Sequence, residues 1–129
     1  MTQKILILIN DAPYGTEKAY NAFRLAMQLG KDHENVEVRV FLMADAANCS
    51  LANHNTPNGY YNIERMLKAV LSKGGKVKIC GSCADARGLK NAPLIEGRYH
   101  SQPNRSTFQQ QLKKVRSPNV SICKVHNPP

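Results

Sequence analysis

The sequence predicts an α/β fold of three layers, α/β/α, in which a mostly parallel sheet lies between helices. Apolar segments with the period of a strand alternate along the chain with segments of helical period. Strands that alternate with helices need crossover connections, which place successive strands parallel to one another. At 129 residues the chain is long enough for one domain with a core of its own.

Two strands and a helix are predicted in the first part of the chain. Residues 4–10 contain five consecutive Ile and Leu residues, whose number and β-branched content favour a strand buried on both faces. Residues 17–32 place apolar side chains on one face of a helix, and Thr16 is positioned to cap it. Residues 36–43 alternate and then become apolar, which predicts the second strand.

The next elements are punctuated by polar residues and glycines. Asp45 is predicted to cap a short helix. Asn62 is predicted to cap an amphipathic helix that a Gly-Gly pair ends before residue 76. Residues 76–79 are predicted to form the third strand, and residues 92–96 a short fourth one.

The most informative stretch begins at Cys80, where the third strand is predicted to end. Ser82 is a candidate helix N-cap, and Gly88 is predicted to end a single turn of helix. A cysteine between the carboxyl end of a strand and the amino end of a helix lies where open α/β sheets bind ligands. We expect the helix N-terminus, together with Arg87 and Lys78, to lower the pKa of the Cys80 thiol.

The loops after the first three strands are predicted to meet at one edge of the sheet, beside Cys80. For some of the candidate site positions another role is open: Asn10 could cap its own loop, and Asp85 and Arg87 could form a solvated ion pair. We predict that the following residues line the site: Asn10, Tyr14, Asp45, Asp85 and Arg87.

Charge and composition restrict the function classes. The net charge is +9, and residues 98–129 carry six Lys or Arg and no acidic residue. Neither an aromatic platform nor a basic helix face accompanies these charges, so we expect no nucleic-acid partner. No apolar run has the length of a membrane span, and the N-terminus has no secretory signal pattern. We therefore expect a cytoplasmic protein with reduced cysteines, no membrane partner and solvated histidines.

Four separated motifs resemble the DsrE/DsrF-like family, and most closely its YchN-type branch. They lie at residues 10–17, 41–46, 59–63 and 80–88. The resemblance covers about residues 3–97, and we take residues 1–97 as the domain. It implies a three-layer α/β/α domain that assembles as a ring-like trimer or hexamer.

The resemblance also implies a function. Several members of the family carry sulfur as a cysteine persulfide in sulfur-relay systems, and their relay cysteine matches Cys80. The leading hypothesis is therefore a persulfide-carrying sulfurtransferase that accepts and passes on sulfur at Cys80, with donor and acceptor proteins as partners and no cofactor. The alternative is a non-catalytic oligomeric binding protein on the same fold.

Cys83 has three interpretations. It could resolve a persulfide, close a disulfide with Cys80, or be a structural thiol. The Cys80–Cys83 pair could also be half of a zinc site, but the other candidate ligands form no second pair at zinc spacing, so we expect no metal. Those ligands are Cys49, which we interpret as a packing residue, His54, Cys123 and His126.

The segment 98–129 departs from the pattern. The resemblance implies a further helix and a final strand there, but the segment is basic and has no clear period of either kind. We predict an irregular basic tail, arising from a frameshift in the coding sequence; the alternative is a genuine divergent tail. Either origin would leave one edge or face of the sheet uncovered.

Overall fold

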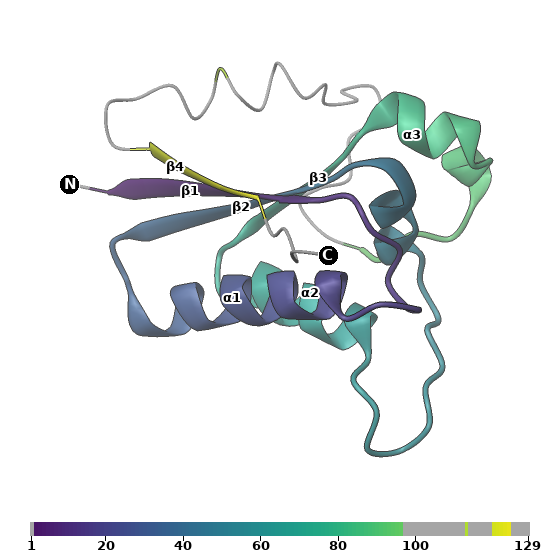
Figure 1. Cartoon of the computed structure of the whole chain (residues 1–129), viewed down its shortest axis with the longest axis horizontal. Helices are drawn as coiled ribbons and strands as arrows, with labels where there is room; N and C mark the ends of the chain where they lie inside the picture. Colours follow the sequence, from purple (N-terminus) through teal and green to yellow (C-terminus); the bar gives the residue numbers. More distant parts are fainter. Residues whose placement is uncertain (1, 97–112, 114–119, 125–129) are drawn as a thin grey trace.

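A computed structural model describes residues 2–96, 113 and 120–124 of the chain (Figure 1). It contains a four-stranded sheet in the order β3-β2-β1-β4, and all neighbouring strands are parallel. The strands are β1 (Gln3–Ile9), β2 (Val36–Leu42), β3 (Lys76–Ile79) and β4 (Val120–Lys124). The first three lie within about one residue of the predicted strands, so the predicted α/β class is confirmed.

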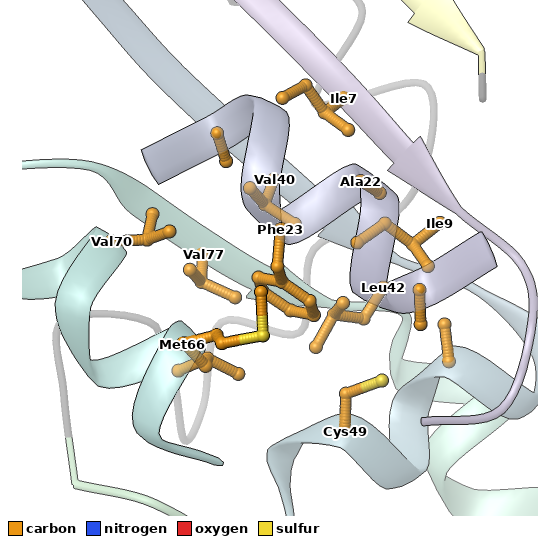
Figure 2. Packing of buried hydrophobic residues seen from close by; sticks show 14 of the residues in the cluster. Ile7, Ile9, Ala22, Phe23, Val40, Leu42, Cys49, Met66, Val70 and Val77 are labelled. Carbon is orange, nitrogen blue, oxygen red and sulfur yellow. The ribbon is translucent and has the colours of Figure 1, made fainter. Parts of the chain in front are cut away.

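Two helices cover one face of the sheet (Figure 1). These are α1 (Lys18–Asp32), which packs against β1 and β2, and α2 (Ile63–Ser72), which packs against α1 and β3. The fully buried Phe23 of α1 belongs to the apolar cluster that these elements share. Figure 2 shows the Phe23 ring between Met66 of α2 and Leu42 of β2. This cluster is the main core of the domain.

The opposite face carries a much smaller apolar cluster at the carboxyl end of the strands. Helix α3 (Gly81–Ala86) lies there, which makes the third layer (Figure 1). The buried members of the cluster are Leu6, Leu8, Phe41 and Cys80. Two short 3-10 helices, η1 (Ala44–Ser50) and η2 (Leu89–Asn91), complete the described part of the chain, in which no helix is long and apolar enough to cross a membrane.

Of the helix caps predicted before residue 80, the one at Asn62 is confirmed, and those at Thr16 and Asp45 are wrong. The Asn62 side-chain oxygen accepts a hydrogen bond from the N–H of Arg65 at 3.1 Å, which caps α2 as expected. The N-cap of α1 is Glu17 and not Thr16, and it makes no side-chain capping bond. Asp45 lies inside the first turn of η1 rather than before it, and its carboxylate pairs with Arg87, the C-cap residue of α3.

The predicted strand at residues 92–96 is also wrong. This segment forms only one antiparallel bridge, between Leu94 and Leu51. The N–H of Ile95 donates to the Ser50 carbonyl at 2.8 Å, so the segment is fastened to the end of η1 instead of to the sheet.

The prediction of an irregular tail is wrong for Val120–Lys124. These residues form β4, which pairs in parallel with β1 from Lys4 to Leu8. We expected one edge or face of the sheet to be uncovered, but β1 has β4 as a partner strand on the side away from β2. The remaining predictions for residues 98–129 lie outside the described residues, apart from Lys113.

Candidate functional site: two thiols at the carboxyl edge of the sheet

The backbone brings Cys80 to the edge where the strands end. Its N–H donates to the Leu42 carbonyl at 2.9 Å, just as the N–H of Met43 donates to the Ile9 carbonyl at 2.9 Å. Cys80 and Met43 therefore leave adjacent strands at the same level, and Asn10, which follows Ile9, does so too. This confirms that Cys80 lies at the carboxyl edge of the sheet.

Helix α3 begins two residues earlier than the predicted cap at Ser82 implies. Cys80 itself is the N-cap residue, and Ser82, the predicted cap, is the second residue of the helix. Gly88 has a φ of 68°, in the left-handed region, and the helix ends before it as predicted. Because α3 has only six residues, local groups rather than a long helix must determine the state of the thiol.

The Cys80 thiol has hydrogen-bonding neighbours within an otherwise apolar cluster. Its side chain is 8% exposed, and its Sγ lies 3.4 Å from the Ser82 Oγ. Burial alone would raise the pKa of this thiol. Hydrogen bonding from the Cys83 and Ser82 side chains and from their backbone N–H groups outweighs burial, so the pKa is lowered. The thiolate of Cys80 is therefore favoured over that of an ordinary cysteine.

The Cys83 thiol has the opposite shift. Burial and the neighbouring Cys80 raise its pKa, since Cys83 acts as the hydrogen-bond donor of the pair. Two groups oppose this effect: the backbone N–H of Ala44 and the positive charge of Arg87 both lower the pKa. Arg87 was expected to act on Cys80, but its charge acts on Cys83.

An ion pair holds α3 against η1. The Arg87 Nε and Nη2 atoms lie 2.9 and 2.8 Å from the Asp45 Oδ1, and Nη1 donates to the Cys83 carbonyl at 3.0 Å. Ala44, just before Asp45, has a φ of 48°, which is unusual for a residue with a side chain. The turn from β2 into η1 therefore places both the Ala44 N–H and the Asp45 carboxylate beside α3.

The other predicted site residues are distributed differently. Asn10 is exposed at the sheet edge, and Asp85 is exposed on α3, while the ion pair of Arg87 is with Asp45. Tyr14 belongs to another cluster: its hydroxyl lies 2.8 Å from the His54 Nδ1 and accepts a hydrogen bond from the N–H of Ile63 at 3.1 Å.

Two residues that the sequence reasoning misjudged can be understood from local patterns. His54 is half-buried and hydrogen-bonded, not solvated as predicted, because its backbone N–H donates to the Glu64 carboxylate at 2.8 Å and fixes the loop. The contact between Tyr14 and His54, which are 40 residues apart, cannot be recognised from a single sequence. Ser82, in contrast, is two residues after Cys80, a spacing that would have identified it as a partner of the thiol.

Cys49 provides a reference for a thiol without such partners. It is fully buried in the main core, among the side chains that Figure 2 shows, and burial raises its pKa to about 12. This confirms its interpretation as a packing residue. In the described part of the chain, no three His, Cys, Asp or Glu side chains are grouped as metal ligands would be.

Comparisons with known proteins identify the family. The model of the DsrE/DsrF-like family matches residues 3–117. The chain belongs to this family. The match extends 20 residues beyond residue 97, where the resemblance in the sequence was taken to end.

The relatives agree with this assignment. The protein YchN of Escherichia coli is 42% identical over 95 residues, which span 74% of this chain and 80% of YchN. An uncharacterized protein of Methanocaldococcus jannaschii is 39% identical over 94 residues, 73% of this chain and 80% of its own length. The crystal structure of the Escherichia coli YchN protein is similar with a TM-score of 0.79 at 34% identity, covering 95% of this chain and 100% of YchN.

Proposed function

We propose that this protein is a sulfur-relay protein that carries sulfur as a persulfide on Cys80. The observation that supports the proposal most strongly is the lowered pKa of a thiol at the carboxyl edge of the sheet. The thiolate is the nucleophile in sulfur transfer, so a lowered pKa increases the reactive fraction at neutral pH. Membership of a family that is linked to sulfur relay agrees with this chemistry.

The transfer step is a thiolate exchange. The Cys80 thiolate attacks the outer sulfur of a donor persulfide, R–S–SH, and forms the Cys80 persulfide. The bond between the two donor sulfurs breaks, and the donor leaves as the thiolate RS⁻. The apolar side chains of Leu8, Phe41 and Met43, which cluster with Cys80, would shield the new persulfide from water until an acceptor thiol removes its outer sulfur.

Donor and acceptor proteins are the partners that this function needs, and the cytoplasm is a suitable compartment because it keeps Cys80 and Cys83 reduced. We also propose that the protein acts as a homo-oligomer, a trimer or a hexamer. β3 is one of the two edge strands of the described sheet, and it lies directly before Cys80. A partner subunit at this edge would lie beside the thiol.

Mass spectrometry of the loaded protein tests the proposal. The reduced chain is incubated with glutathione persulfide, and the peptide that contains Cys80 should gain about 32 Da, the mass of one sulfur atom. Cys80→Ser should abolish this gain. Cys49→Ser removes a buried core thiol and should leave loading unchanged. Equal loading of the Cys80→Ser variant and the unsubstituted chain would refute the proposal.

The second candidate is a non-catalytic oligomeric binding protein. The 8% exposure of Cys80 favours it, because a donor must reach the sulfur to transfer to it. This function predicts that Cys80 stays unmodified by the persulfide while sedimentation of the same sample shows a homo-oligomer. Loading of Cys80 at a stoichiometry near one per chain would exclude this alternative.

A further inference from the structure

We infer that Cys83 is a second reacting thiol, which discharges the Cys80 persulfide within the same chain as hydrogen sulfide and closes a Cys80–Cys83 disulfide. This inference rests on the proposed function, since it concerns the fate of the sulfur on Cys80. It assigns to this chain a way of releasing its sulfur without an acceptor protein.

The two thiols are already placed for this reaction. Cys80 is the N-cap of α3 and Cys83 its third residue, so they are one helical turn apart. Their side chains are hydrogen-bonded to each other and share one apolar cluster. A disulfide spans Cα atoms up to about 6.8 Å apart, so it can join residues that are one helical turn apart.

The contact also selects which sulfur is attacked. The Cys83 thiol hydrogen-bonds to the Sγ of Cys80, which is the inner sulfur of the persulfide. Attack there forms the bond between the two cysteine sulfurs and breaks the bond to the outer sulfur, which leaves as HS⁻. The HS⁻ takes up the proton that Cys83 loses, so the products are a disulfide and H₂S.

The electrons balance without an external oxidant. The outer sulfur of the persulfide is reduced to sulfide, and the two cysteine sulfurs are oxidised to the disulfide. The chain then needs a thiol reductant before it can accept sulfur again. A Cys80 persulfide that meets no acceptor would therefore end as a closed, unloaded state.

The surroundings of Cys83 support a nucleophile that is slow but competent. Burial and Cys80 hold its pKa above the ordinary value, so its thiolate is scarce and the persulfide has time to meet an acceptor. The Ala44 N–H and the Arg87 guanidinium favour the thiolate once it forms.

Intact mass measurement combined with a sulfide electrode tests the inference. The full reduced chain is loaded with glutathione persulfide, and the donor is removed by rapid desalting. The species about 32 Da heavier should decay to one about 2 Da lighter than the reduced chain, with release of one H₂S. Peptide mapping should place the disulfide between Cys80 and Cys83, and dithiothreitol should restore the reduced mass.

Substitutions separate this inference from the proposed function. In Cys83→Ser, and in Cys83→Ala as a second variant, the heavier species should persist and H₂S release should be lost. Cys49→Ser and Cys123→Ser are the controls and should discharge like the unsubstituted chain. Release of H₂S by the Cys83 variants at the unsubstituted rate, or a stable persulfide in the unsubstituted chain, would overturn the inference while the proposed function stands. Failure of both the unsubstituted chain and the Cys83 variants to load would refute the proposed function, and the inference with it.

Discussion

The two faces of the sheet differ in what their cysteines experience. On one face of the sheet, α1 and α2 bury a large apolar cluster that includes Cys49. On the opposite face, at the carboxyl ends of the strands, the short helix α3 covers a small cluster that includes Cys80. Both cysteines are at least nine-tenths buried, yet burial raises the pKa of Cys49 to about 12, whereas the pKa of Cys80 is lowered.

The difference shows that hydrogen-bond donors, and not exposure, distinguish the two thiols. Cys80 begins a helix, so the side chains and N–H groups of Ser82 and Cys83 lie around its sulfur. Cys49 ends up in a fully packed core, where only its own backbone opposes the effect of burial. The face covered by α1 and α2 therefore contributes the main core, and the carboxyl edge beside α3 holds the reactive thiol.

The largest effect on stability is expected in the main core, on the face of the sheet that α1 and α2 cover. Phe23→Ala removes a fully buried ring from the main core and should lower the free energy of unfolding by about 3–5 kcal/mol. Urea denaturation measures it. Leu25→Ala on the same helix, whose side chain is 37% exposed, is the matched control and should cost about 1 kcal/mol or less. Equal losses for the two variants would mean that Phe23 does not anchor the core.

A smaller loss of stability is expected at the ion pair between α3 and η1. Arg87→Ala removes a partly exposed pair with Asp45, so unfolding should become easier by only about 1 kcal/mol or less. Its effect on chemistry should be larger: without the guanidinium charge, the pKa of Cys83 should rise further. The pH dependence of Cys83 alkylation, read by peptide mapping, measures this rise. Lys90→Ala removes an exposed cation of η2 and should leave the pH profile of Cys83 alkylation unchanged.

The smallest effect on stability is expected from Ser82→Ala, an exposed position where we predict a change within about 0.5 kcal/mol. The variant removes one of the groups that favour the Cys80 thiolate, so the pKa of Cys80 should rise and its alkylation should begin at higher pH. Ser72→Ala is the control, because that hydroxyl donates to the Ala69 carbonyl of its own helix. An unchanged pH profile of Cys80 alkylation in Ser82→Ala would show that Ser82 does not stabilise the Cys80 thiolate.

Elements with a strong local signal could be predicted from the sequence. The apolar run of β1, the helical period of α2 and its Asn62 cap are local patterns, and the structure has them where expected. Gly88 ended α3 as predicted because a left-handed φ favours glycine. The position of Cys80 followed from the same local reasoning.

Features that depend on distant contacts could not be predicted. β4 exists because β1 offers it a parallel partner, although the alternation of Val120 and Ile122 with polar residues was a weak signal within the basic segment. Pairing of Asp45 with Arg87 spans 42 residues, and it moved Asp45 from a cap to an ion pair. The assignment of Arg87 to Cys83 instead of Cys80 depends on that same contact.

Competitive alkylation of the folded protein tests the central claim most directly. The reduced chain is treated with limiting iodoacetamide at neutral pH, and the labelled cysteines are identified by peptide mapping. Because the pKa of Cys80 is lowered and that of Cys49 is about 12, Cys80 should be labelled first, and Cys49 only after unfolding in urea. Labelling of Cys49 or Cys123 before Cys80 would contradict the claim that Cys80 is the reactive thiol.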